Sequence, residues 1–275
     1  MSGGSPPAGR PELPPGATPV GIGLVRPDLL GTYGDGGNAL VLAERLVRRG
    51  IPAEVVPLMA GAEVPSSVAV LVLGGGEDAA QRSLLRDATL VRGVCQAVER
   101  DVPVLAVCAA LQILGKYFDD GEGGRTPGVG LVDVETDRLE RRAVGETVVE
   151  PAAGTGLDLG ATLLSGFENP GGRTTRGAGC APLGHVRVGV GNGDGTDGVV
   201  TGRIVGTYLH GPVLARNPVL ADRMLEWAVG PLEPLAMPLV DQLHEERLAA
   251  ARAERDRQPV SAAGSRRRGR AASTG

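Results

Sequence analysis

A cysteine and a histidine, each at the end of an apolar run, are the residues of this chain best suited to covalent catalysis. Cys108 follows the Val- and Leu-rich residues 104–107, and His210 ends a second apolar run about a hundred positions later. An apolar run that stops at a cysteine flanked by alanines is typical of a strand-to-helix turn that presents a nucleophile. A histidine within reach would hold the thiol proton, so we predict a Cys–His pair that attacks an amide or ester carbon.

Backbone N–H groups near the thiol are the next requirement, because the attack creates a tetrahedral oxyanion. The N–H of Ala109, directly after the nucleophile, is one expected donor. The second is expected from the triglycine 74–76, centred on Gly75, where the missing side chains let the backbone approach a substrate. No Lys-Ser/Thr follows this triglycine, which argues against a phosphate-binding loop.

The elements that must position these groups follow an alternating pattern. Apolar runs predict strands, and the spacing of apolar residues between them predicts helices, which together indicate βαβ units and a parallel sheet. The expected strands are 20–25, 52–56, 68–73 and 104–107, and the expected helices are 36–49 and 82–100. After residue 125, glycine-rich turns separate strand-like stretches at 129–135, 147–149, 162–167, 185–190 and 199–209, before a helix at 217–229. We predict a single α/β domain: a mostly parallel twisted sheet with helices on both faces and an antiparallel extension.

The two ends of the chain differ from this domain in composition. Residues 1–17 are rich in Gly and Pro and are expected to be disordered. The domain is expected to span 18–245, followed by a basic tail at 246–275 that begins as a helix. The arginines near its end could attract anionic lipid head groups at the inner face of the membrane.

Composition excludes several classes of protein. The formal net charge of −4 gives no general reason to expect nucleic acid as a partner. No apolar stretch approaches the roughly 18 residues of a transmembrane segment, and the N-terminus lacks the apolar core of a signal peptide. Three cysteines without close spacing do not suggest a disulfide framework or a structural metal site. A cytoplasmic protein is expected.

Six short motifs carry a resemblance to a known family. In order and at matching spacing, the chain resembles the class I, or triad-type, glutamine amidotransferases of the cobyric-acid-synthase-like branch over about residues 21–230. The motifs are YGDGGN at 33–38, GGGED at 74–78 with Gln81, VC at 107–108 with Gln112, TDRL at 136–139, GFEN at 166–169 with GGRT at 171–174, and GTYLHGP at 206–212.

The resemblance implies a glutaminase. Cys108 matches the family nucleophile, His210 its base, and Arg138 an arginine that grips the α-carboxylate of L-glutamine, with Gln112 also in the substrate site. Glutamine would be deamidated through a γ-glutamyl thioester. Within the branch, the chain is most similar to glutaminase subunits of lipid II isoglutaminyl synthases. That similarity implies a MurT-like Mur ligase partner, which would amidate the D-glutamate of lipid II in peptidoglycan synthesis. ATP would bind in the partner, and this chain would need no cofactor or metal.

The chain departs from the family pattern at four positions. Ala106 and Ala110 replace the glycines around the nucleophile, and Pro170 replaces a histidine that follows Glu-Asn. Pro212 stands where many triad enzymes place a glutamate two residues after the histidine. We therefore expect a Cys–His dyad, completed by a carboxylate of the partner.

Other readings remain open from the sequence. Asp35 and Asn38 are expected to cap or fix the first turn before the helix at 36–49, and His244 is expected to face solvent. The ammonia acceptor could also be a corrinoid or another carboxylate. The substituted glycines and the missing glutamate would also suit a degenerate subunit that only binds or scaffolds.

Overall fold

The core of the protein is a six-stranded sheet with strand order β13-β14-β4-β3-β1-β2. The computed structural model describes residues 16, 18–119 and 124–257. All neighbouring strands of this sheet are parallel except β13, which runs antiparallel to β14 at one edge. The strands are β1 Val20–Val25, β2 Ala53–Leu58, β3 Val68–Leu73, β4 Val104–Val107, β13 Val199–Thr201 and β14 Ile204–Thr207.

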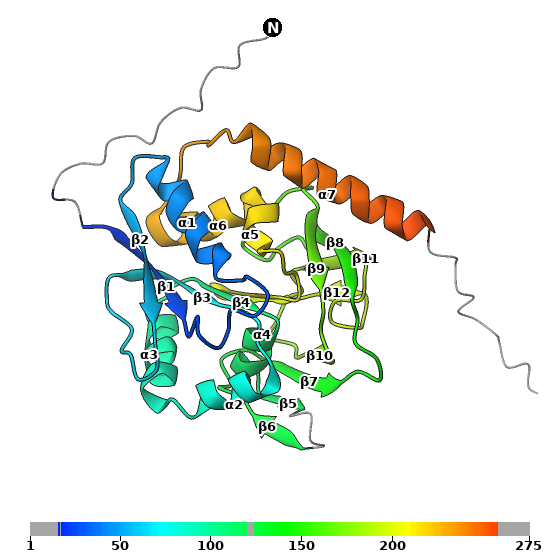
Figure 1. Ribbon diagram of the computed structural model, residues 1–275, viewed down its shortest axis with the longest axis horizontal. Coiled ribbons are helices and arrows are strands. Elements are labelled where there is room, and N and C mark those ends of the chain that lie inside the picture. Colours follow the sequence, from blue (N-terminus) through cyan, green and yellow to red (C-terminus); the bar gives the residue numbers. More distant parts are fainter. Residues whose placement is uncertain (1–15, 17, 120–123, 258–275) are drawn as a thin grey trace, which may run out of the picture.

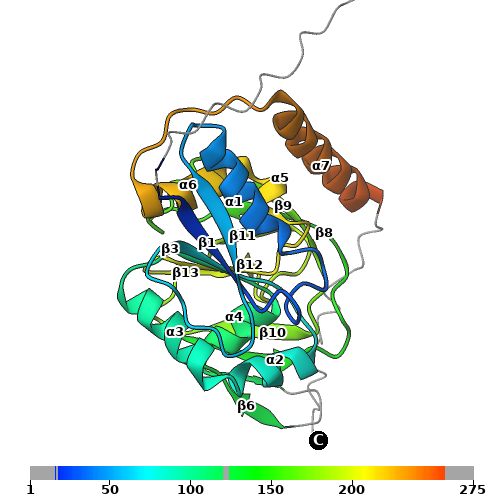
Figure 2. The same cartoon turned by 60° about the vertical axis from the view of Figure 1, so that its left-hand side comes forward.

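Helices cover both faces of this sheet, as predicted (Figure 1, Figure 2). One layer contains α1 Gly37–Val47, α5 Val213–Arg216 and α6 Pro218–Val229, and the other contains α2 Asp78–Leu85, α3 Ala88–Glu99 and α4 Ala109–Leu114. Because the central strands are buried on both faces, β4 is apolar at every position and fully buried. Because β1, β3, β4 and β14 are parallel neighbours, their carboxyl ends meet at one edge, where a ligand site of such a sheet lies.

The second half of the chain extends this sheet less than predicted. Only β13 and β14 join it, and the remaining strands form two separate four-stranded sheets. Their orders are β10-β7-β5-β6 and β12-β11-β8-β9. The bounds are β5 Tyr117–Asp119, β6 Arg125–Pro127, β7 Val134–Arg138, β8 Gly145–Pro151, β9 Leu164–Glu168, β10 Gly172–Arg176, β11 Gly184–Val188 and β12 Thr196–Asp197.

The helix predicted over 82–100 is two helices. Asp87 separates α2 from α3, because its carboxylate accepts a hydrogen bond from the Leu90 N–H and thereby caps the start of α3. The Asp87 carboxylate also accepts a hydrogen bond from the N–H of Gly61, which ties the break to the loop after β2.

The C-terminal helix α7, Pro238–Arg257, crosses the boundary predicted at residue 245. Leu248 and Ala251 are buried against Val148 of β8, so this part of the helix packs on the folded domain. The expectation for His244 was wrong, since the side chain is buried and its Nδ1 lies 2.7 Å from the carbonyl oxygen of Arg216. The residues beyond 257, and those before 16, lie outside the described part of the chain.

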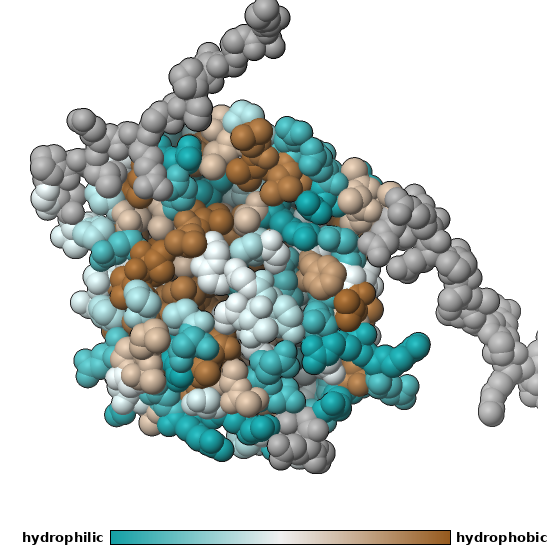
Figure 3. Space-filling model, in the orientation of Figure 1, coloured by the Kyte–Doolittle hydropathy of each residue, from teal (hydrophilic) through white to brown (hydrophobic). Residues whose placement is uncertain are grey.

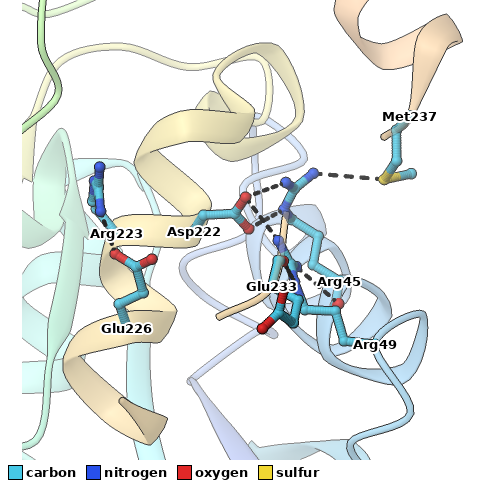
Figure 4. A network of polar contacts seen from close by, with 7 residues as sticks. All are labelled: Arg45, Arg49, Asp222, Arg223, Glu226, Glu233 and Met237. Carbon is cyan, nitrogen blue, oxygen red and sulfur yellow. Dashed lines mark hydrogen bonds and ion pairs between the residues drawn. The ribbon is translucent and has the colours of Figure 1, made fainter. Parts of the chain in front are cut away.

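A charged network fixes α1 against α6 (Figure 4). The guanidinium of Arg45 donates two hydrogen bonds to the Asp222 carboxylate, at 2.7 and 2.6 Å, and Arg49 donates a third at 2.9 Å. Arg49 also donates to the carbonyl oxygen of Glu233 in the segment leading to α7. The bidentate geometry holds α1 in one orientation and with it the loop that precedes this helix.

Apolar side chains also gather on the surface beside α1. A groove between α1, the edge strand β2 and the start of α7 is lined by Leu40, Val41, Val55, Val240 and Leu243. Figure 3 shows apolar surface where α1 and the start of α7 lie. Within the described residues, no helix is both long and apolar enough to cross a bilayer.

Candidate active site

Cys108 lies on a strained turn between β4 and α4. Its backbone has φ +53° and ψ −106°, a combination that L-residues other than glycine rarely adopt. The Cys108 N–H donates to the carbonyl oxygen of Thr207 at 2.8 Å, which continues the pairing of β4 with β14 past the end of the strand. Ala106 and Ala110 are fully buried, and neither has a positive φ. The predicted turn is therefore present, and the alanines do not strain it because the positive φ falls on the cysteine.

His210 follows β14, the strand beside the one that carries Cys108. Its backbone forms two hydrogen bonds with Phe167, in which the His210 N–H donates at 2.8 Å and its carbonyl accepts at 3.0 Å. Only 2% of its surface is exposed. The carboxyl ends of two neighbouring parallel strands therefore bring the predicted pair together.

Asp35 orients the imidazole, and the sequence analysis missed this role. The carboxylate is fully buried, and its Oδ2 lies 2.9 Å from His210 Nδ1. The same oxygen accepts a hydrogen bond from the Gly75 N–H at 2.8 Å. The expected absence of an orienting acid in this chain was wrong: the acid comes from the loop after β1, far from the histidine in the sequence.

The capping roles expected for Asp35 and Asn38 were also wrong. Residue 36 caps α1 without a side-chain hydrogen bond. Asn38 Oδ1 instead accepts a hydrogen bond from the Leu214 N–H at 2.9 Å, so it fixes α5 just after the histidine segment.

The electrostatics of the site favour a charged imidazole. Burial alone would lower the pKa of His210, but the hydrogen bond to Asp35 and the interaction with Cys108 outweigh burial and raise this pKa to about 10. The second ring nitrogen, Nε2, is buried and has no conventional hydrogen-bond partner among the described residues. Nδ1 is thus committed to Asp35, while Nε2 remains for proton exchange with the thiol and a substrate.

Cys108 opens into a cavity of about 200 Å³, smaller than the roughly 300–1,000 Å³ of a site for a drug-sized ligand. Gln112 and Arg138, both predicted to bind substrate, line this cavity together with the thiol. Arg138 ends β7 and is exposed, and no ion pair of the described residues occupies its guanidinium. Among those residues, no group of three or more His, Cys, Asp or Glu side chains is arranged to hold a metal ion.

The N–H groups of the two expected oxyanion donors, Ala109 and Gly75, differ in their hydrogen bonds. Ala109 is the first residue of α4, and its N–H makes no inter-element hydrogen bond within the described chain. The Gly75 N–H instead donates to Asp35, and Gly75 lies directly behind the imidazole. Gly76, rather than Gly75, lines the cavity beside Cys108. The triglycine therefore supplies both a support for Asp35 and a neighbour of the reacting centre.

Tyr33 covers the imidazole and was not singled out as a site residue. Its ring centroid lies 4.8 Å from that of His210, and its hydroxyl donates to Glu77 at 3.2 Å. The same hydroxyl accepts a hydrogen bond from Asn169 at 3.3 Å, so three loops meet over the histidine. The motif at 33–38 contains Tyr33 and Asp35, but only the fold places them beside residue 210.

Comparisons with known proteins identify the family of this chain. Residues 21–218 match the model of the CobB/CobQ-like glutamine amidotransferase domain. The chain is 31% identical over 238 residues to subunit GatD of the lipid II isoglutaminyl synthase (glutamine-hydrolyzing) of Staphylococcus aureus, covering 84% of this chain and 94% of that protein. GatD of Streptococcus pneumoniae is 32% identical over 209 residues, or 74% and 77% of the two chains. The cobyric acid synthase of Caulobacter sp. is 32% identical, but the match covers 55% of this chain and 30% of that protein.

A solved structure supports the fold alone. A crystal structure of a glutamine amidotransferase superposes with a TM-score of 0.54 at 23% identity, covering 75% of this chain and 98% of its own. The matched family model spans most of the described domain, including the nucleophile turn and the histidine. The chain therefore belongs to the family of CobB/CobQ-like glutamine amidotransferase domains.

Proposed function

We propose that this chain hydrolyses L-glutamine through a thioester on Cys108 and supplies the ammonia to a Mur-ligase-like partner that amidates the D-glutamate of lipid II. The observation that carries the proposal is the arrangement of three side chains at one sheet edge. Cys108 stands on the strained turn and opens into the cavity, while the buried Asp35 holds His210 beside it. Such a triad activates a nucleophile for attack on an uncharged amide.

The reaction follows from these positions. The Cys108 sulfur attacks the side-chain carboxamide carbon of glutamine, and the oxyanion forms beside the N–H groups of Ala109 and Gly76. His210 Nε2 then gives its proton to the departing nitrogen, which leaves as ammonia and creates the thioester. The same nitrogen, now unprotonated, takes a proton from water, and the resulting hydroxide attacks the thioester carbon. The Cys108 thiolate leaves, glutamate is released, and His210 is protonated again. Glutamine and water thus yield glutamate and ammonia.

The lipid II acceptor is supported by the pattern of similarity. The two GatD proteins match this chain over 94% and 77% of their own lengths, whereas the cobyric acid synthase matches over 30%. The ATP that activates the acceptor carboxylate is expected in the partner. This chain would act as the ammonia source of the assembly.

Co-expression with a Mur-ligase-like protein tests the whole proposal. Mass spectrometry of lipid II should detect glutamine-dependent replacement of a carboxyl OH by NH₂ on the stem peptide. Cys108→Ser should abolish this change when glutamine is the nitrogen donor and retain it when ammonia is added. Cys95→Ser, which alters a partly buried cysteine on α3 away from the cavity, is the matched control.

Two other results would contradict parts of the proposal. Glutamine hydrolysis without amidation of lipid II would retain the chemistry but assign the ammonia to another acceptor, such as a corrinoid carboxylate. Absence of hydrolysis with any ligase partner would leave only a binding or scaffolding subunit.

A further inference from the structure

A buried glutamine on the wall of the active-site cavity lacks a partner for its carbonyl. Gln81 lies in α2 and is 2% exposed, and it lines the same cavity as Cys108. Its Nε2 donates to Gln112 Oε1 at 2.6 Å, while its own Oε1 is buried without a hydrogen bond among the described residues. An unpaired buried carbonyl is costly, so its retention at a cavity points to a donor supplied by a ligand.

A chain of hydrogen bonds holds Gln81 in place. Gln112 Nε2 donates to the Tyr208 hydroxyl at 3.2 Å, and that hydroxyl lies 2.5 Å from Thr174 Oγ1. Thr174 is in turn 2.9 Å from Thr136 Oγ1, which lines the cavity. The amide of Gln112 is therefore used on both sides, by Gln81 and by Tyr208. The carbonyl of Gln81 is the end of the chain that remains for a ligand.

The charges around this carbonyl favour a cation. Glu77 and Asp78 precede Gln81 by four and three residues, a spacing that places all three on one side of the helix start. Both carboxylates line the cavity with Gln81. A ligand that donates a hydrogen bond and carries positive charge would match this wall.

The other wall carries side chains of both signs, including two arginines. Arg138 and Arg142 line the cavity from the segment at the end of β7. Asp137 and Glu140 line it from the same segment, and Asp137 pairs with Arg125. Gln112 contacts both walls. Its Oε1 bonds α2, and its Nε2 lies close to Gly172, the register partner of Arg138.

We propose that the Gln81 carbonyl accepts a hydrogen bond from the α-ammonium group of the amino-acid substrate, while Arg138 takes its α-carboxylate. With the side-chain amide at Cys108, the α-carbon of glutamine is then fixed at three points. Three contacts distinguish L- from D-glutamine and reject amides that lack the α-amino group. Gln81 is thus a specificity-determining residue, and the assignment rests on the proposed glutaminase function.

The test compares two ligands on the full-length chain. L-glutamine and its deamino analogue 4-carbamoylbutanoate are titrated by calorimetry into Cys108→Ala, which cannot turn over, with and without Gln81→Met. Methionine keeps the length of the side chain but has no strong acceptor. Gln81→Met should weaken the binding of L-glutamine by about 10- to 100-fold, the range for a hydrogen bond to a charged group, and leave the analogue unchanged.

Tyr208→Phe is the matched control, because it removes a hydroxyl from the same network and leaves the Gln81 carbonyl in place. It should change the binding of the two ligands to the same extent. If Gln81 acted only through Gln112, its replacement would weaken both ligands equally, and this result would overturn the proposal. Unchanged L-glutamine binding would overturn it as well. Failure of the glutaminase proposal is seen separately, as absence of glutamate release by the wild-type chain with a ligase partner.

Discussion

His210 and Asp35 stand 175 residues apart in the chain, yet His210 Nδ1 lies 2.9 Å from Asp35 Oδ2. Both side chains are buried, and the same carboxylate oxygen accepts the Gly75 N–H. The carboxylate fixes the ring and stabilises its charged form, so the imidazole presents Nε2 to the reacting centre. An acid placed before α1 thereby does what a glutamate two residues after the histidine would do in other triad enzymes.

Asp35→Asn should reduce kcat/KM for glutamine by about 10²- to 10⁴-fold, because the amide neither stabilises the imidazolium nor imposes its orientation. The pKa of His210, raised to about 10, should fall toward its ordinary value of 6.5 when the carboxylate is lost. The basic limb of the pH profile of kcat/KM should therefore move to lower pH. Asp28→Asn, which alters a carboxylate paired with Arg26 on the same loop, should leave the profile in place. An unshifted basic limb in Asp35→Asn would show that the carboxylate does not act on the histidine.

Gly75→Ala should impair catalysis without unfolding the protein. A Cβ at this position would lie 2.8 Å from His210 Cε1 and 3.1 Å from Asp35 Oδ2, so the imidazole must shift. Displacement of a catalytic group by about 1 Å can cost on the order of 10²-fold in rate. Steady-state glutaminase assays and circular dichroism would measure the two effects. Gly145→Ala, where a Cβ meets nothing within 4 Å, serves as the control, and equal activity of the two variants would contradict the expected shift.

The ends of buried strands were predictable because apolar runs mark them directly. Residues 20–25 and 68–73 form strands with the predicted bounds, and the turn at Cys108 lies where the apolar run stops. Short polar strands carry no such signal. Gly172–Arg176 forms β10 through its pairing with β7, and that pairing depends on tertiary contacts rather than on local sequence.

The candidate site was predictable in part for the same reason. Cys108 and His210 end neighbouring strands, so their proximity follows from a parallel sheet. Asp35 belongs to a glycine-rich loop whose residue types equally suit a helix cap. The tertiary contacts of its carboxylate with the Gly75 N–H and His210 Nδ1 decide between the two roles. Gln81 is a polar residue on a helix, and only the fold shows that its carbonyl is buried without a partner.

Two substitutions of Cys108 measure its backbone strain independently of its role in hydrolysis. Both Cys108→Ala and Cys108→Gly should abolish glutamine hydrolysis, but the glycine variant should be the more stable of the two. Relief of the positive φ is worth about 1–3 kcal/mol, and the extra freedom of glycine in the unfolded chain offsets about 0.5–1 kcal/mol of it. Chemical denaturation would measure the difference. The opposite order is expected at an unstrained position such as Ala110, where Ala110→Gly should destabilise the protein.

Ionisation of the buried Asp197 carboxyl should make the protein less stable as the pH rises toward neutrality. Desolvation by burial raises the pKa of this carboxyl to about 7, with the Glu168 charge acting in the same direction, while Thr207, the Tyr208 N–H and His210 oppose the rise. A folded-state pKa above the unfolded value means that the stabilising contribution is complete below about pH 4 and is lost as the pH passes 7.

Asp197→Asn should therefore flatten the fall in melting temperature between pH 5 and 8, measured by calorimetry relative to the wild type. The amide fits the same space and carries no charge to bury, so the difference between the two curves should grow with pH. Asp194→Asn is the control, since the pKa of Asp194 is lowered: despite desolvation, its hydrogen bonds with Thr196 and the charge of Arg176 favour the ionised form. The stabilisation by Asp194 is lost as the pH falls, so its variant should differ from wild type in neutral solution and converge with it in acid. A pH-independent difference for Asp197→Asn would mean that the buried carboxyl does not titrate in this range.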